Sequence, residues 1–388
     1  LSTTQSISLA AGAPAKLNFR TGTNATVQPG KVEAGVVFDN APTIEVQDAE
    51  GNLVTTATTS VVATLFKGGV AVSPAVTSTK SASGGIATFD ATSFSVTRGT
   101  DYTLVYSASN LTSSSATNQF EITNGAPRTV RFTTNPTPIG AGISYSTFVA
   151  GTSAADSVPA LEVVDAAGNA ITGGSEAVLT VSLVNSDGTT VTLPAGVTTA
   201  TVLSGRTATT TNGAASLGSL IVRATAGTYK LVVSGTVDGV AVPVSAEASI
   251  TIRNGVITTA VLADRGSSTS ATAGVAFNPQ PIVIFRDAFG NDFTHQYTAG
   301  SNYGLTSDGI TPTISAIAPD GATLLTHSWS NLSSGRSTAT GLGLAARSGT
   351  REVSYNVASP LTIATNLTQS WTLGAGVPTT IKLTQQPS

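Results

Sequence analysis

Cysteine and methionine are both missing from this sequence of 388 residues. Because there is no cysteine, the fold contains neither a disulfide nor a thiolate metal site, and the burial of apolar side chains has to stabilise it. Charged residues make up 10% of the chain, aromatic residues make up 5%, and the formal net charge is -3. A chain without basic clusters has nothing with which to neutralise phosphates, so we expect no nucleic-acid partner.

Long apolar runs are missing as well. No stretch approaches the roughly 20 uninterrupted apolar residues of a membrane span, and the first residues lack the charged-then-apolar pattern of a signal peptide. A chain without methionine is expected to be a processed or truncated piece of a longer product, from which any signal peptide has gone. The abundance of serine and threonine, without runs of charge, favours a folded protein at an extracellular surface.

One short motif recurs three times in this background. It reads Asp48-Ala-Glu-Gly-Asn52, Asp165-Ala-Ala-Gly-Asn169 and Asp287-Ala-Phe-Gly-Asn291. An Asp that opens a type I turn accepts a backbone hydrogen bond two residues on, and a Gly three positions later supplies the left-handed residue of a three-residue hairpin loop. The motif therefore predicts a hairpin whose Asp and Gly lie at an exposed turn.

A strand is expected to lead into each of these hairpins. A proline stands six residues before each Asp, and apolar residues alternate after it with the period of two that is typical of strands. The alternation predicts that one residue of each strand points into a core: Ile44, Leu161 and Val283.

Two further elements repeat along the chain and divide it into modules. A Gly-Ala-Pro or Gly-Val junction occurs near residues 12, 125, 255 and 376, and a strand that begins with Gly-Thr precedes each later junction. In the first two modules this strand alternates Tyr with apolar residues. Intervals of roughly 110 to 130 residues suit one domain each, so the chain is expected to hold about three. The predicted ranges are a closing or docking strand at 1–11, modules at 12–124, 125–254 and 255–375, and an opening or docking strand at 376–388.

The fold class follows from what these repeats share. No window longer than a turn or two has the apolar period of a helix, and β-branched residues dominate throughout. The Tyr102 and Tyr229 strands are similar to the strand that carries a tyrosine corner in β-sandwiches, whereas module three displaces its Tyr by two residues. We therefore expect an all-β chain, a tandem array of antiparallel β-sandwiches.

Taken together, the junctions, the Asp-Ala-x-Gly-Asn hairpins and the Gly-Thr-Tyr strands resemble the bacterial immunoglobulin-like modules of invasin- and intimin-type proteins. They also resemble the tandem modules of surface-layer and adhesin proteins. The resemblance implies immunoglobulin-like sandwiches strung in a rod, with a structural or adhesive role at the cell surface. It supplies no catalytic residues to carry over.

Catalysis finds little support in the residues themselves. The two histidines, His295 and His327, stand in no metal-ligand spacing and beside no identifiable nucleophile, and the sparse carboxylates lie mostly in turns. We therefore expect no enzyme and no cofactor. Calcium is the one candidate ion, since hard cations bind turn carboxylates, and the equivalent residues Asp48, Asp165 and Asp287 are its candidate ligands. The preferred interpretation is that these Asp side chains cap their own turns.

Module three differs from the other two in its apolar content. Its motif strand, Ile282-Val-Ile-Phe285, is apolar on both faces, which predicts that both faces are covered. An aromatic run follows its hairpin. Two interpretations are open: a longer loop folds over its own core, or the run contacts a neighbouring subunit or a cell-surface glycan. The candidate interface residues are Ile282, Ile284, Phe289, Phe293, Tyr297 and Tyr303.

The leading functional hypothesis is an extracellular structural protein, a subunit of a self-assembling surface layer or filament whose main partner is itself. One rival is a passive stalk that holds an adhesin tip away from the cell. Another makes these modules accessory domains of a secreted glycan-active enzyme. The strand-like segments at the two ends are expected to dock on a sheet edge of an adjacent module or of a neighbouring chain.

Overall fold

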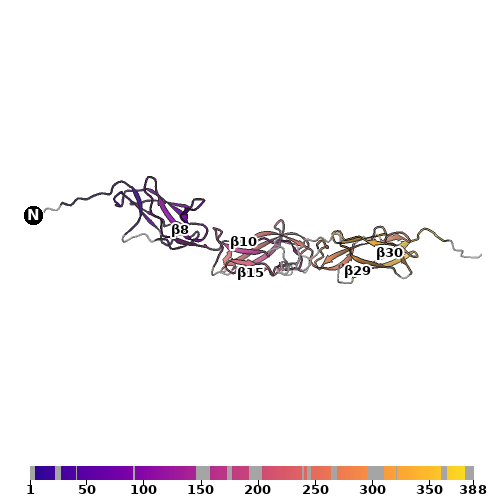
Figure 1. Ribbon diagram of the computed structural model, residues 1–388. Helices are drawn as coiled ribbons and strands as arrows, with labels where there is room; N and C mark the ends of the chain where they lie inside the picture. The colour runs from indigo at the N-terminus through magenta and orange to yellow at the C-terminus, as the bar shows by residue number, and fades with distance from the viewer. Residues whose placement is uncertain are drawn as a thin grey trace, which may run out of the picture.

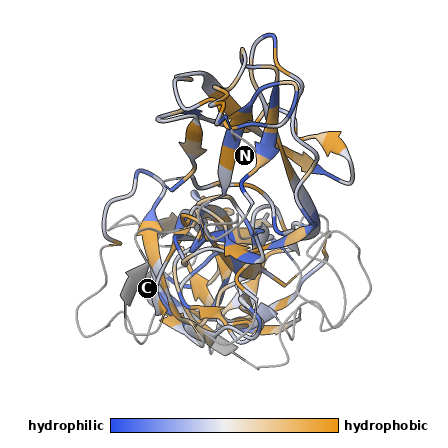
Figure 2. Ribbon diagram, turned by 90° about the vertical axis from the view of Figure 1, so that its left-hand side faces the viewer, coloured by the Kyte–Doolittle hydropathy of each residue, from blue (hydrophilic) through white to orange (hydrophobic). Residues whose placement is uncertain are grey.

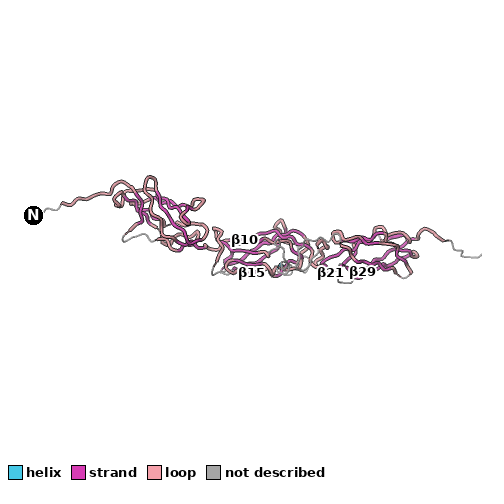
Figure 3. Tube along the Cα trace, viewed as in Figure 1, coloured by secondary structure: helices cyan, strands magenta, loops and turns pink. Residues whose placement is uncertain are grey.

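The structure is a computed structural model, and its described elements are all β-strands. It describes residues 5–21, 28–40, 42–90, 92–145, 158–172, 177–191, 203–237, 240–242, 246–263, 269–295, 310–319, 321–359 and 365–380. The strands form three groups that follow one another along an elongated row, and the first group is tilted against the line of the other two (Figures 1 and 3). We call these groups modules one, two and three.

Module one contains the strands β1 to β9. One sheet has the order β1-β3-β7, and the other has the order β2-β9-β8-β4-β5, with β6 also paired to β4. The bounds are β1 (Lys16–Phe19), β2 (Lys31–Glu33), β3 (Thr43–Gln47), β4 (Ser60–Lys67), β5 (Val70–Ala71), β6 (Thr77–Ser81), β7 (Ile86–Thr88), β8 (Gly99–Ser107) and β9 (Phe120–Thr123).

Module two contains β10 to β20. Its sheets have the orders β10-β12-β16 and β11-β20-β18-β13-β15, with β19 paired to β18 and a separate pair β14-β17. The bounds are β10 (Thr129–Thr134), β11 (Ile139–Gly140), β12 (Ala160–Val164), β13 (Ala177–Asn185), β14 (Leu203–Ser204), β15 (Thr207–Thr209), β16 (Ala214–Ser216), β17 (Ile221–Val222), β18 (Gly227–Val237), β19 (Val240–Val242) and β20 (Glu247–Arg253).

Module three contains β21 to β30. Its sheets have the orders β21-β23-β27-β26 and β22-β30-β29-β24, with a separate pair β25-β28. The bounds are β21 (Ile257–Leu262), β22 (Ser270–Thr272), β23 (Ile282–Asp287), β24 (Thr313–Ile317), β25 (Thr323–Leu324), β26 (Ser328–Trp329), β27 (Arg336–Thr340), β28 (Leu344–Ala345), β29 (Gly349–Ser359) and β30 (Thr365–Gly374).

The three modules share one strand arrangement. In each, the first strand pairs antiparallel with the strand that leads into the Asp hairpin, as β1 does with β3. In each, a second short strand pairs parallel with the last strand of the opposite sheet, as β2 does with β9. A first strand divided between two sheets is an immunoglobulin-like feature. The predicted all-β fold, a tandem array of immunoglobulin-like antiparallel β-sandwiches, is confirmed.

The predicted period of two also holds in the cores. Ile44, Leu161 and Val283 are each 0% exposed, as expected, and each module has apolar core clusters between its sheets. Hydrophobic and hydrophilic residues mix along the same strands, which fits sheets with one buried and one solvated face (Figure 2). Burial of such alternating positions contributes most of the stability of a fold without disulfides.

A buried tyrosine fixes one end of modules one and two. The Tyr229 hydroxyl donates to the carbonyl of Thr225 at 3.0 Å, and the Tyr102 hydroxyl donates in the same way to the carbonyl of Thr97. This is the tyrosine-corner interaction that the Gly-Thr-Tyr strands suggested. In module three, Arg351 takes this position, because it pairs with Trp371 of the last strand as Tyr229 pairs with Ile250.

Candidate functional site: the joints between modules

Each Asp-Ala-x-Gly-Asn motif forms the hairpin that its residue types predict. In the second motif the N–H of Asp165 donates to the carbonyl of Asn169 at 3.0 Å, and the N–H of Gly168 donates back to the carbonyl of Asp165 at 3.1 Å. Gly168 has a φ of 82°, a conformation that glycine adopts without strain. The first and third motifs have the same two backbone bonds.

The motif Asp is buried, which contradicts the expectation of an exposed turn residue. Asp48, Asp165 and Asp287 are only 2%, 3% and 2% exposed. In the third motif one carboxylate oxygen accepts the N–H groups of Phe289 and Asn291, as a turn-capping Asp does. The other oxygen accepts the side-chain amide of Asn291 at 2.8 Å and the N–H of the linker residue Gly255 at 2.6 Å. The carboxylate is therefore buried because it ties the hairpin to the linker.

The motif Asn binds the preceding module. The side-chain oxygen of Asn169 accepts the N–H of Arg98 at 2.9 Å, and its side-chain amide donates to the carbonyl of Val96 at 2.9 Å. Asn291 contacts module two in the same way: its oxygen accepts the N–H of Ala226 at 2.6 Å, and its amide donates to the carbonyl of Ala224 at 3.3 Å. One Asn thus pairs with a backbone carbonyl and a backbone N–H two residues apart.

The variable residue of the motif also contacts the preceding module. Ala167 packs against the core cluster of module one, and Phe289 packs against the core cluster of module two. Phe289 lies so close to Gly142 that a Cβ atom on that glycine would meet its ring at 2.7 Å. Each hairpin therefore joins two modules by both hydrogen bonds and apolar contact.

The linker glycine completes each joint. A Cβ on Gly125 would lie 2.3 Å from the carbonyl oxygen of Ala34, and a Cβ on Gly255 would lie 2.2 Å from the carbonyl oxygen of Ala141. No side chain fits at such distances from backbone atoms. We call the set Gly125, Asp165 and Asn169 the first joint, and the set Gly255, Asp287 and Asn291 the second joint.

The second joint has an additional polar residue that the sequence interpretation missed. Asn254 is 0% exposed, and its side-chain oxygen accepts the N–H groups of Thr294 and His295. Its side-chain amide donates to the carbonyl of His295 at 2.8 Å. The signal in the sequence is the Asn-Gly pair, which precedes the linker in module one as Asn124-Gly125 and in module two as Asn254-Gly255.

Hydrogen bonds lower the pKa of Asp48 and of Asp165, the motif carboxylates of modules one and two. The side-chain amide of Asn52 and then the N–H of Gly12 lower the pKa of Asp48 to about 2. At Asp165, burial acts to raise the pKa, but the N–H of Gly125 and the side-chain amide of Asn169 outweigh it, so the pKa lies below its ordinary value. The hairpins of modules one and two are therefore built around an ionised carboxylate.

This ionisation makes the contribution of Asp48 dependent on pH. A carboxyl whose pKa is lowered on folding stabilises the folded state fully above its unfolded pKa of 3.8, and the contribution is lost as the pH falls towards about 2. We expect Asp48→Asn to lower the melting temperature of module one near neutral pH, and this deficit to shrink between about pH 4 and pH 2. Calorimetry of both proteins across this range tests the expectation. A deficit that stays constant with pH would contradict it.

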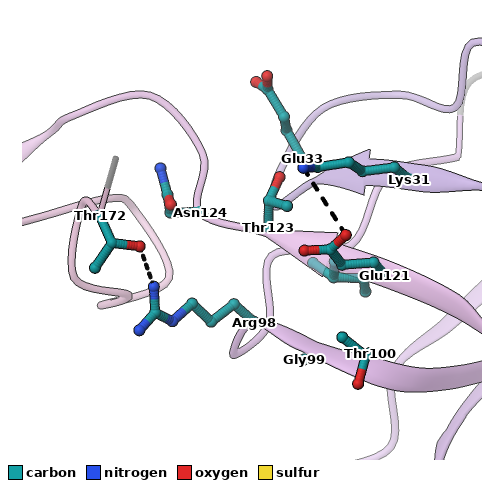
Figure 4. A pocket seen from close by; sticks show the side chains of 10 residues that line it. Lys31, Glu33, Arg98, Gly99, Thr100, Glu121, Thr123, Asn124 and Thr172 are labelled. Carbon is teal, nitrogen blue, oxygen red and sulfur yellow. Dashed lines mark hydrogen bonds and ion pairs between the residues drawn. The ribbon is translucent and has the colours of Figure 1, made fainter. Parts of the chain in front are cut away.

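A polar groove runs beside the first joint. It has a volume of about 550 Å³, and its lining includes Lys31, Arg98, Glu121 and Thr172 (Figure 4). Lys31 lies 3.8 Å from Glu121, and the Arg98 guanidinium donates to the hydroxyl of Thr172 in module two (Figure 4). Lys31 and Glu121 form an ion pair between the neighbouring strands β2 and β9, and Arg98 adds one polar contact between modules one and two.

The candidate site residues lie as follows. The oxygens of Asp48, Asp165 and Asp287 accept N–H groups, and within the described ranges no three His, Asp or Glu side chains gather as metal ligands would. Ile284 and Phe293 are buried within the chain, and Ile282 is half-buried. Phe289 lies in the second joint, whereas Tyr297 and Tyr303 fall outside the described residues.

Comparison with known proteins gives likeness of fold only. The sequence matches no protein-family model and no curated protein. Among solved structures, the chain is similar to invasin, a bacterial integrin-binding protein, with 15% identity, a TM-score of 0.30 and coverage of 90% of this chain and 58% of that one. It is also similar to Yersinia pseudotuberculosis InvD, with 16% identity, a TM-score of 0.31 and coverage of 89% and 96%.

A third similar structure comprises domains 5-6 of the S-layer protein SbsC, with 12% identity, a TM-score of 0.21 and coverage of 66% of this chain and 100% of that one. The similar structures thus include the invasin type of bacterial protein that the motifs resemble. The chain spans 58% of the invasin structure, and what these proteins bind or build is a property of theirs.

Proposed function

We propose that the chain is an extracellular structural protein, a rod-like subunit of a self-assembling cell-surface layer or filament. The two joints carry this proposal. In each, a linker glycine, a buried carboxylate and an asparagine that bonds to the preceding module hold neighbouring sandwiches at one angle. A lattice or filament needs subunits that present their contacts at reproducible distances, and joints of this kind meet that need.

The proposed role is non-catalytic, and its main partner is the protein itself. Composition supports an extracellular position, because the chain is rich in serine and threonine and has no cysteine that oxidation could alter. No helix in the described part of the chain is long and apolar enough to cross a membrane.

Negative-stain microscopy of the purified chain at rising concentration tests the proposal. We expect sheets or fibres with a longitudinal repeat set by the three-module rod. Strictly monomeric rods at all concentrations would overturn the self-assembling role. The rival hypothesis, a passive stalk that holds an adhesin tip away from the cell, would then be favoured. Asp287→Ala removes the carboxylate of the second joint, so the angle between modules two and three should vary from molecule to molecule. Such subunits cannot pack in one regular lattice, and the longitudinal repeat should become irregular or disappear.

A further inference from the structure

The two ends of the row each hold one half of a joint. The N–H of Gly12 donates to Asp48 at 2.8 Å, as the linker glycines Gly125 and Gly255 donate to their own motif Asp. At the other end, a Cβ on Gly376 would lie 2.3 Å from the carbonyl oxygen of Ala273, and this is the contact that Gly125 and Gly255 make with the preceding module. Among the described residues, Gly12 does not lie close to a backbone carbonyl of another module, and Gly376 does not lie close to an Asp carboxylate.

The far end of module three also offers the backbone pair that a motif Asn binds. Gly349 opens β29 as Gly99 opens β8 and Gly227 opens β18, so Ala346 and Ser348 occupy the places of Val96 and Arg98. Ser348 is exposed, and among the described residues neither its N–H nor the carbonyl of Ala346 takes part in a backbone hydrogen bond outside the sheets. The carbonyl and the N–H that an Asn occupies in both joints are therefore open here.

The charge at this end favours an acidic hairpin. Arg351 stands where modules one and two have a tyrosine, and its guanidinium donates to the carbonyl of Arg347 at 3.5 Å, a marginal distance. The Nε atom of Arg351 is buried and has no hydrogen-bond partner among the residues that the structure describes, and Arg347 is exposed. A buried guanidinium nitrogen without an acceptor is costly, so a carboxylate brought to this end would bind favourably.

Module one shows what such a hairpin looks like. Its variable residue is Glu50, where the other two hairpins have Ala167 and Phe289, and Glu50 is exposed. Its Asn52 is exposed as well, and among the described residues its side chain bonds only to Asp48, at 3.0 Å, whereas Asn169 and Asn291 are 6% and 5% exposed. The hairpin of module one thus matches the end of module three in both hydrogen bonding and charge.

We propose that the far end of module three binds a further immunoglobulin-like module, joined through Gly376, by means of an Asp-Ala-Glu-Gly-Asn hairpin. In this third joint the Asn accepts the N–H of Ser348 and donates to the carbonyl of Ala346. The Asp accepts the N–H of Gly376, and the Glu contacts Arg347 and Arg351. Joining through Gly376 is favoured over docking of a separate chain, because a separate chain would bring its own linker glycine to a place that Gly376 fills.

An extended chain tests the proposal, with residues 1–375 followed by a second copy of residues 12–124, so that Gly12 of the copy takes the place of Gly376. The measurement is the hydrogen-exchange rate of the Ser348 amide, with that of Ala226 in the second joint as the internal standard. We expect Ser348 to exchange at least about tenfold more slowly in the extended chain than in the original chain. An unchanged rate for Ser348, with the fourth module folded, would overturn the proposal.

Two substitutions in the added copy identify the contacts. Asn52→Ala there should return Ser348 to fast exchange, whereas the same substitution in the original module one should leave Ser348 protected. Glu50→Lys in the added copy should weaken the protection because it places like charges together, and Glu50→Ala should weaken it less. Protection that survives both Asn52→Ala and Glu50→Lys would rule out the proposed contacts.

The original chain, without an added copy, tests whether a second molecule binds at the same place. If its Ser348 amide becomes protected as protein concentration rises, a second copy occupies the site, and the assignment to a module joined through Gly376 is wrong. This inference does not depend on the proposed function. Sheets or fibres of the original chain test the assembly role, and the exchange of Ser348 in the extended chain tests the third joint.

Discussion

Replacement of Asp287 by Ala is expected to lower the free energy of unfolding of module three by about 3 kcal/mol. The substitution leaves four donors of the second joint without their acceptor: the N–H groups of Gly255, Phe289 and Asn291, and the side-chain amide of Asn291. Hydrogen bonds to a charged group contribute about 1.5 to 3 kcal/mol each, and bonds that share one carboxylate are not additive.

Tryptophan fluorescence measures this loss in module three alone. The chain has two tryptophans, Trp329 in β26 and Trp371 in β30, and both belong to module three. Their transition in urea therefore reports one module of the row, which avoids fitting a single free energy to three domains. A midpoint unchanged in Asp287→Ala would contradict the importance of the carboxylate.

Two variants control for other causes. Asp165→Ala removes the equivalent carboxylate from the first joint and should leave the tryptophan transition unchanged, because modules two and three retain the second joint. Asp287→Asn keeps the size of the side chain and one acceptor oxygen but removes the charge. Its effect should be smaller than that of Asp287→Ala.

The strands and their register were predictable because they rest on local information. An alternation of apolar residues over five positions is enough to place Ile44, Leu161 and Val283 in a core, and the structure buries all three. The hairpin type was predictable for the same reason, since the turn bonds of the Asp-Ala-x-Gly-Asn motif join residues at most four positions apart.

The joints were not predictable from the motif alone, because their bonds join residues far apart in the sequence. The bond from Gly125 to Asp165 spans 40 residues, and the bond from Arg98 to Asn169 spans 71. A turn Asp that caps its own loop has the same local sequence as one that also holds a linker, so exposure was the natural expectation.

The candidate interface residues also show that a local sequence pattern does not identify the distant surface that a residue contacts. The aromatic character of Phe289 predicted a contact beyond its own sheet, and the structure places this ring against the core of module two. Sequence pattern carries no information on which surface receives an exposed aromatic ring. The residues between the hairpin and β24 that lie outside the described ranges, Tyr297 and Tyr303 among them, remain candidates for a contact with another subunit or a glycan.

Replacement of Gly255 by Ala is expected to open the second joint while all three modules stay folded. A Cβ at this position would lie 2.2 Å from the carbonyl oxygen of Ala141 and 3.3 Å from its carbonyl carbon. Both are backbone atoms beside β11, which cannot move away as a flexible side chain can. Crowding of this kind costs about 1 to 3 kcal/mol, and the linker can relieve it only by moving away from module two.

Opening of the joint should be visible in three measurements. The Ala226 amide, which donates to Asn291 at 2.6 Å, should exchange at least about tenfold faster. Small-angle X-ray scattering should show a broader distribution of long distances, because modules two and three no longer keep one angle. The tryptophan transition should shift only by the loss of the contacts at the joint, since β21 to β30 are otherwise intact.

Gly30→Ala is the matched control for this substitution. A Cβ on Gly30 would meet no atom within 4 Å, so the variant has the same chemical change without the crowding. It should leave both the exchange of the Ala226 amide and the scattering curve unchanged. If Gly255→Ala gave the same result as Gly30→Ala, the close approach of the linker to Ala141 would not hold the joint. The angle between modules two and three would then depend on the bonds of Asp287 and Asn291 alone.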